Sequence, residues 1–123
     1  MSAADLVLPA PSEGSAEVGA RVARARSVQR TRFAALGAVA ARMRTNADCA
    51  GQLLEQIAMP DEAGLSLLRE ASATLGLSAR GFHRTLKVAR TIADLDGADG
   101  VGRMHVAEAL SYRGEAMRQQ QAA

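Results

Sequence analysis

Hydrophobic residues recur every three or four positions along most of the chain, which is the spacing of a helix that buries one face. The first such pattern predicts a helix over residues 15–32, with Ser15 as its N-terminal cap. Its expected buried stripe comprises Val18, Val22, Ala25 and Val28. Arginines fill the remaining faces, so this helix should be apolar on one side and basic on the others.

Two weaker patterns follow this helix. A helix over residues 33–47 is predicted from apolar spacing, although Gly37 interrupts it. Its apolar positions are Leu36, Val39 and Met43. A short helix over residues 48–58 should end before Pro60, because a residue that precedes proline is pushed out of the α region.

The C-terminal half carries clearer start and stop signals. Asp61 caps one helix, and Gly76 is the expected residue where that helix ends in left-handed backbone. Its apolar stripe is Leu65, Leu68, Ala71 and Leu75. Ser78 caps the next helix, which Gly97 closes, and a last helix follows to about Met117. The apolar positions of this last helix are Val106, Ala109 and Leu110.

Together these patterns predict one all-α domain, a small bundle of four to five helices. Its core must be mainly aliphatic, since 48% of the residues are hydrophobic but only Phe33, Phe82 and Tyr112 are aromatic. The expected organisation is a flexible lead-in at 1–14, the helical domain at 15–117 and a disordered tail at 118–123, which has nothing apolar to bury.

Several classes of protein are disfavoured by the sequence. It has no apolar run of the length that spans a membrane and no signal segment at its start, so we expect a cytoplasmic protein without a membrane partner. The single Cys49 cannot form an internal disulfide, and the spacing of His83 and His105 matches no zinc site.

Positive charge is concentrated in one region, although the net charge is only +2. Residues 18–47 contain no acid, and their arginines lie at positions 21, 24, 26, 30, 32, 42 and 44. Such a block is either a solvated surface or a surface that faces nucleic acid or an acidic subunit. Both interpretations stay open, with Arg26 and Arg30 among the candidate contacts.

The helix between Ser78 and Gly97 has a basic face at 100° per residue. That face carries Arg80, Arg84, Lys87, Thr91, Asp94 and His83, and the apolar face carries Phe82, Leu86, Ala89, Ile92, Ala93 and Leu95. Arg90 is expected to pair with Asp94 one turn later. Arg84 and Lys87 are candidate contacts for phosphate, DNA or a neighbouring subunit.

Arg80 is the most informative residue of this helix, because it lies in the first turn. The unpaired backbone N–H groups and the helix dipole make a cation there unfavourable by about 0.3–1 kcal/mol at an exposed site. A bound phosphate would reverse that sign. The position suggests a phosphate contact at Arg80, and the alternative is an arginine that is solvated or paired with an acid from a loop.

Residues 77–97, "LSARGFHRTLKVARTIADLDG", together with "HVAEALSYR" at 105–113, resemble a known family. They are similar to the C-terminal end of the bacterial magnesium-chelatase-like AAA+ ATPases, the competence protein ComM or YifB family. A weaker similarity extends upstream through Ala25-Arg26, Gln29, Arg30 and Arg32, and again at Asn46-Ala47.

This resemblance implies a lid domain, the small helical bundle that folds over bound ATP in AAA+ proteins. The "SAR" at 78–80 is similar to the family's sensor-2 motif, which implies that Arg80 reaches the γ-phosphate. The sequence contains no G-x-x-x-x-G-K-[ST] loop, so we expect no catalysis by this fragment alone and no cofactor of its own. ATP and Mg²⁺ would belong to the ATPase core of the parent protein.

The resemblance also implies partners for that parent protein. They are the upstream ATPase core of the same chain, identical subunits in a hexameric ring, and DNA that the motor remodels during competence or recombination. The alternative, which rests on the acid-free region at 18–47, is a stand-alone basic helical module that binds nucleic acid.

Overall fold

The computed structural model describes residues 14–37, 43, 45–49 and 51–122, with side chains described in these ranges except at 47 and 113–122. The elements are α2 (Ser15–Ala35), the 3₁₀ helix η2 (Asn46–Asp48), α3 (Gly51–Ala58), α4 (Glu62–Leu75), α5 (Ala79–Leu95) and α6 (Arg103–Ala122). The described residues form no strand, and their one β-bridge joins Pro60 to Val101. The prediction of an all-α bundle is confirmed.

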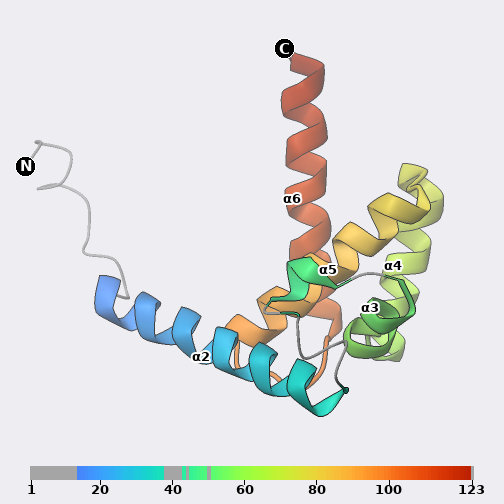
Figure 1. The fold of residues 1–123 in the computed structure, drawn as a ribbon. Helices are drawn as coiled ribbons and strands as arrows, with labels where there is room; N and C mark the ends of the chain where they lie inside the picture. The colour runs from blue at the N-terminus through green and yellow to red at the C-terminus, as the bar shows by residue number, and fades with distance from the viewer. Residues whose placement is uncertain (1–13, 38–42, 44, 50, 123) are drawn as a thin grey trace, which may run out of the picture.

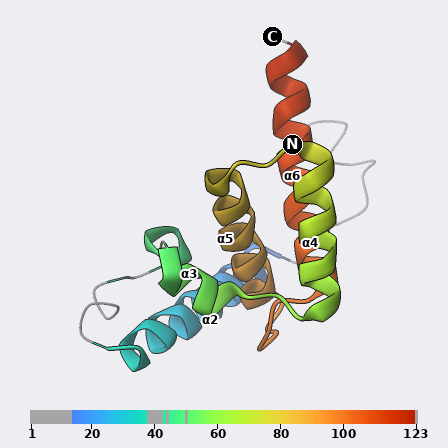
Figure 2. The ribbon, with the colours of Figure 1, turned by 90° about the vertical axis from the view of Figure 1, so that its right-hand side faces the viewer.

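Helix α5 lies at the centre of this arrangement. It packs against α2, α3, α6 and η2, whereas α4 packs mainly against α6. Figure 2 shows α4, α5 and α6 side by side, with the α4–α5 turn at one end and the α5–α6 loop at the other. Helix α2 crosses α5 near the end that carries the α5–α6 loop, and its N-terminal half projects away from the other helices (Figure 1).

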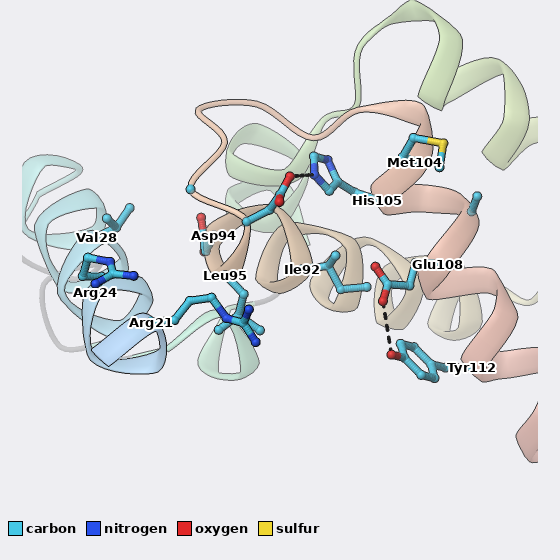
Figure 3. A pocket seen from close by; sticks show the side chains of 13 residues that line it. Arg21, Arg24, Val28, Ile92, Asp94, Leu95, Met104, His105, Glu108 and Tyr112 are labelled. Atoms are coloured by element: carbon cyan, nitrogen blue, oxygen red, sulfur yellow. Dashed lines mark hydrogen bonds and ion pairs between the residues drawn. The ribbon is translucent and has the colours of Figure 1, made fainter. Parts of the chain in front are cut away.

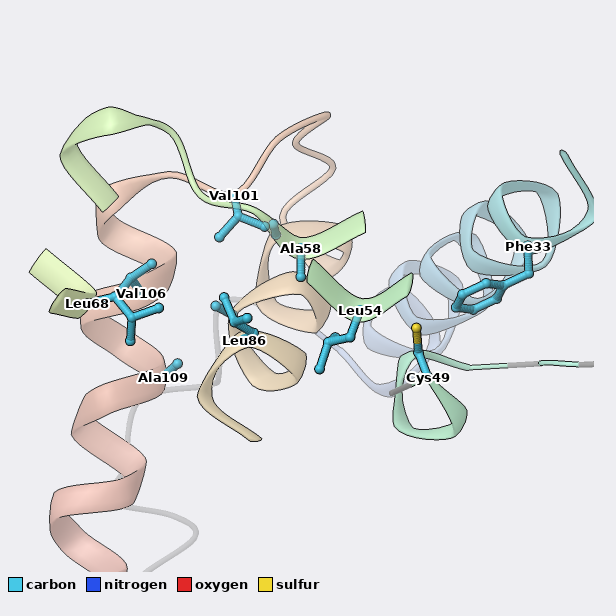
Figure 4. Close-up of a cluster of buried hydrophobic side chains, with 11 residues drawn as sticks. Phe33, Cys49, Leu54, Ala58, Leu68, Leu86, Val101, Val106 and Ala109 are labelled. Carbon is cyan, nitrogen blue, oxygen red and sulfur yellow. The ribbon is translucent and has the colours of Figure 1, made fainter. Parts of the chain in front are cut away.

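The hydrophobic core extends through the bundle as one cluster of buried side chains. Its largest fully buried apolar side chains are Phe33, Leu54, Leu68, Leu86, Val101 and Val106. Alanines at positions 58, 89, 93 and 109 lie between them and let the helices approach closely. Figure 4 shows the sequence of contacts from Val106 on α6, past Leu86 on α5, to Phe33 on α2.

Helix α2 is longer than predicted, and its buried stripe is different. Of the predicted stripe, Ala25 is buried and Val22 is half-buried, but Val18 and Val28 are 38% and 49% exposed, and Gln29 and Phe33 are buried instead. Val18 lies in the N-terminal half of α2, which projects away from the other helices, and Val28 lies about 100° around the helix from Gln29. The cap was also wrong, since the N-cap position is occupied by Gly14 and no side chain bonds there.

The segment from 33 to 47 does not form the predicted separate helix in its described part. Helix α2 takes the first three residues and ends at its C-cap, Leu36, and Gly37 then leaves the helical backbone with φ of 120°. Met43 is not helical but packs on the core. Residues 38–42 and 44 lie outside the described residues, as does the lead-in at 1–13. Helix α3 begins at Gly51, later than predicted.

The predicted helix boundaries further along the chain are confirmed. The Asp61 carboxylate accepts a hydrogen bond from the backbone N–H of Gly64 at 2.8 Å and caps α4. Gly76 ends α4 with φ of 65°, and Gly97 follows α5 with φ of 74°. Both glycines adopt left-handed backbone that a residue with a Cβ atom rarely adopts.

The last helix departs from the prediction at its C-terminus. It was expected to end near residue 117, but α6 continues to Ala122, so residues 118–122 are helical where we expected a tail. Its predicted apolar positions are confirmed, since Val106 and Ala109 are buried and Leu110 packs on the core. None of the helices in the described part of the chain combines the length and apolar composition needed to cross a membrane.

Candidate functional site

The N-terminus of α5 presents Arg80 to solvent. The Ser78 hydroxyl accepts a hydrogen bond from the backbone N–H of Gly81 at 3.1 Å, so the predicted cap is confirmed and fixes where the helix begins. Arg80 lies in the turn that follows, which contains no acidic residue. Its side chain is exposed and makes no hydrogen bond or ion pair with another described residue. This guanidinium is therefore available to a ligand.

The next turns of α5 continue this cationic surface. Arg84 is exposed and Lys87 is half-buried, and both line a shallow hollow of about 300 Å³. The other lining residues are Val88, Thr91 and Ile92. The structure thus brings Arg84 and Lys87 together, one turn beyond Arg80 on the same face of the helix.

Asp94 does not belong to the exposed basic face on which the helical wheel placed it. Its side chain is 0% exposed, and it lies at the centre of a charged cluster that we define as Arg32, Asn46, Arg90 and Asp94. Arg32 of α2 donates two hydrogen bonds to the carboxylate, at 2.6 and 3.0 Å. The wheel prediction was wrong for Asp94 because α2 and η2 cover this part of α5.

Arg90 completes the cluster from within α5. It donates to the Asp94 carboxylate at 2.9 and 3.2 Å, which confirms the predicted pair one turn apart. The same guanidinium donates to three backbone carbonyls, those of Ile57, Ala98 and Asp99. Arg90 therefore ties α5 to the end of α3 and to the α5–α6 loop.

Asn46 connects the cluster to η2. Its side-chain amide donates to Asp94 at 2.9 Å and to the Thr91 hydroxyl at 3.1 Å, and its carbonyl oxygen accepts from Arg32. Its backbone N–H donates to the buried Gln29 side chain of α2. The sequence analysis assigned no contact to Arg32, Asn46 or Gln29. Arg32 and Asn46 are 45–62 positions from their α5 partners and Gln29 is 17 positions from Asn46, and no local spacing marks such contacts.

Burial and charge act in opposite directions on the two α5 members of the cluster. Burial alone would raise the pKa of Asp94, but hydrogen bonds from Arg32 and Asn46 and the charge of Arg90 outweigh it and hold the pKa below its ordinary value. Burial lowers the pKa of Arg90, and the charge of Asp94 opposes that shift. Asp94 is therefore ionised, and the cluster fixes α2 across α5.

The remaining sequence-predicted cations lie on a different helix. Arg26 and Arg30 are exposed on α2 and form no hydrogen bond or ion pair among the described residues. They lie about 40° apart around the helix axis at 100° per residue, so they share one flank. The structure does not unite them with Arg80 and Arg84 in one site.

The two histidines form separate surface pairs. The Nε2 atom of His83 lies 3.2 Å from Oε1 of Glu55, and the Nε2 atom of His105 lies 3.1 Å from Oδ2 of Asp96. No group of three metal-ligating side chains occurs in the part of the chain that the structure describes.

Comparisons with known proteins show that the chain is similar to one domain of longer proteins. The family model described as "Magnesium chelatase, subunit ChlI C-terminal" matches residues 12–113. The chain is 39% identical over 101 residues to "Competence protein ComM" of Haemophilus influenzae, a match that covers 82% of the chain and 18% of that protein. It is 40% identical over 104 residues to an uncharacterized protein of Mycobacterium tuberculosis, with 85% and 20% covered.

A shorter match has a higher identity. The chain is 62% identical over 39 residues to the uncharacterized protein YifB of Escherichia coli, a match that covers 32% of the chain and 8% of that protein. Over the longer matches the chain spans about a fifth of the length of its curated relatives.

Proposed function

The chain belongs to the family of the magnesium chelatase subunit ChlI C-terminal domain, and from this premise we propose that it is the lid of a related AAA+ ATPase in which Arg80 senses bound ATP. The observation that carries the proposal is the position of Arg80, an exposed cation without a described partner in the first turn of α5. A phosphate oxygen would satisfy both this guanidinium and the nearby backbone N–H groups.

The surroundings of α5 support a role that needs a fixed helix. Ser78 sets the first residue of the helix, and the charged cluster holds its C-terminal part against α2, α3 and η2. Side chains on rigid, well-packed elements hold a binding geometry more closely than side chains on loops. Movement of this lid relative to an ATPase core would therefore carry Arg80 toward or away from the γ-phosphate as one body.

The residues of this chain fit one phosphate contact and not a complete nucleotide site. Arg80 supplies a cation with several donors, but the sequence has no Gly-rich phosphate loop. ATP and Mg²⁺ would be held by the core of the parent protein, where Mg²⁺ neutralises phosphate charge when bound. The contribution of this chain would be to orient and neutralise the terminal phosphate through Arg80.

The test is steady-state ATP hydrolysis by the full-length protein that carries this domain. One charge-assisted hydrogen bond contributes about 1.5–3 kcal/mol, so Arg80→Ala should lower kcat by about 10- to 150-fold. Arg103→Ala is the matched control, since Arg103 is also an exposed first-turn arginine but begins α6 at the opposite end of the α5–α6 pair (Figure 2). Equal turnover in both variants would refute the role of Arg80.

Contact with DNA is a second part of this proposal, within a parent that assembles as a homo-oligomeric ring. It is supported by Arg26 and Arg30, two exposed cations that share one flank of α2. Each phosphate contact that is lost reduces the slope of log K against log salt concentration by about 1. The double variant Arg26→Ala/Arg30→Ala should therefore reduce the slope for duplex DNA by about 2, and an unchanged slope would exclude this flank.

A further inference from the structure

A groove of about 1110 Å³ lies between α2, the end of α5 and the start of α6. Figure 3 shows its two walls, with Arg21, Arg24 and Val28 on α2 and with Met104, Glu108 and Tyr112 on α6. Ile92 and Leu95 of α5 lie between these walls. The volume exceeds the roughly 300–1,000 Å³ of most small-molecule sites, so a polypeptide segment fits it better.

The acidic side chains of this groove already have partners. Asp96 lies 3.1 Å from His105, and Glu108 accepts a hydrogen bond from the Tyr112 hydroxyl at 3.3 Å. Asp94 is held by Arg32 and Arg90. The two guanidinium groups offset the charge of Asp94, whereas Asp96 and Glu108 keep theirs, so the acidic side of the groove is the one formed by the end of α5 and by α6.

Arg24, on the α2 wall of the groove, is exposed and forms no hydrogen bond or ion pair with any described residue. Behind this wall the charged cluster holds two guanidinium groups, those of Arg32 and Arg90, against the single carboxylate of Asp94. The field in the α2 side of the groove is therefore positive, and it is complementary to an acidic ligand.

Apolar side chains are also unusually exposed along the groove. Val28 is 49% exposed, Met104 is 77% exposed and Tyr112 is 55% exposed. Large apolar side chains that gather around a hollow mark an interaction surface, whereas scattered ones do not. Methionine and tyrosine are also enriched in protein interfaces.

From this complementarity we infer that the groove binds an amphipathic α-helix of a partner protein, with an apolar stripe and acidic residues on one flank. The apolar stripe packs on Val28, Ile92 and Met104, and the acidic flank faces Arg24. A helix laid into an apolar groove is a recurring mode of recognition. Nucleic acid fits less well, because its phosphates would also lie beside Asp96 and Glu108.

Binding of three synthetic helices to the 123-residue chain tests this inference, with fluorescence anisotropy as the readout. Each peptide has about 16 residues and the same leucine stripe, with glutamate, glutamine or lysine at the flanking positions. The glutamate peptide should bind about tenfold more tightly than the glutamine peptide, and the lysine peptide should bind most weakly.

Charge reversal on α2 locates the contact. Arg24→Glu should weaken binding of the glutamate peptide by about tenfold and strengthen binding of the lysine peptide. Arg69→Glu is the matched control, because it makes the same charge change on α4, which does not line the groove, and should alter neither. Both residues are exposed, so neither variant should unfold the chain. Equal effects of the two variants, no preference for the glutamate peptide, no binding of any peptide, or displacement of the glutamate peptide by equimolar duplex DNA would overturn the inference.

Discussion

The substitution Asp94→Asn tests the account of the charged cluster. It keeps the size of the side chain but removes the carboxylate to which both Arg32 and Arg90 are bonded, and the side chains of these arginines are 17% and 4% exposed. Two guanidinium groups would then remain largely buried without their shared counter-charge. Breaking a buried ion pair by removing one partner costs about 3–5 kcal/mol.

This cost is large compared with the stability of such a domain. A domain of this size unfolds with a free energy of roughly 5–15 kcal/mol, so the variant should lose about a fifth or more of its stability. The midpoint of thermal unfolding should fall by about 12 °C or more, since each kcal/mol corresponds to about 4–8 °C in a small domain. Urea unfolding followed by circular dichroism measures the free energy of unfolding directly.

Asp96→Asn is the control for this experiment. It makes the same chemical change two residues away, at a carboxylate that is 69% exposed and bonded to His105. Exposed ion pairs contribute about 0–1 kcal/mol, so the free energy of unfolding of this variant should stay close to that of the parent. If Asp94→Asn also lost less than about 1 kcal/mol, the cluster would not be what fixes α2 on α5, and the reasoning would be refuted.

Two further predictions concern the pH dependence of stability at Asp94 and the packing around Gly64. Because the folded-state pKa of Asp94 lies below its ordinary value of 3.8, its contribution to stability is present above about pH 4 and is lost as pH falls through the folded-state pKa. Urea titrations between about pH 2 and pH 5 should therefore show the parent approaching Asp94→Asn in stability, and a constant difference would contradict this assignment. Gly64→Ala should destabilise by about 1–3 kcal/mol, because its new Cβ atom would lie 2.9 Å from the Pro60 Cβ atom and 3.2 Å from the Gly102 backbone. Gly19→Ala on α2 meets open space and should stabilise by up to about 1 kcal/mol, so equal effects of the two substitutions in urea unfolding would disprove the close approach at Gly64.

Local signals predicted the C-terminal half of the fold well. The caps at Asp61 and Ser78 and the left-handed Gly76 depend on residues within one turn of each other, so the sequence alone determines them. The Arg90–Asp94 pair was predictable for the same reason. Contacts one turn apart are visible in a sequence because helix geometry alone brings them together.

The buried side of α2 could not be predicted in this way. A spacing of three and four residues fits the stripe from Val18 to Val28 as well as the observed stripe from Ala25 to Phe33. The choice depends on where α5 lies against α2 and on the contact of Arg32 with Asp94, 62 positions away. Tertiary contacts of this kind also removed Asp94 from the basic face that the helical wheel had drawn.

The candidate site shows the same division between local and tertiary information. The dipole argument singled out Arg80 from the sequence, and the structure adds that its side chain is exposed and unpaired among the described residues. The groove beside α2 had no counterpart in the sequence, because its walls come from residues up to 91 positions apart, Arg21 and Tyr112. That Arg80 contacts ATP stays a prediction.

The most direct test of that prediction is photolabelling of the full-length protein with an ATP analogue that carries an azidoanilide on its γ-phosphate. Mass spectrometry of the labelled peptides would locate the terminal phosphate. We expect label on the first turns of α5, around Arg80 and Arg84, and loss of that label in Arg80→Ala but not in Arg103→Ala. Label confined to other parts of the protein, with none on α5, would contradict it.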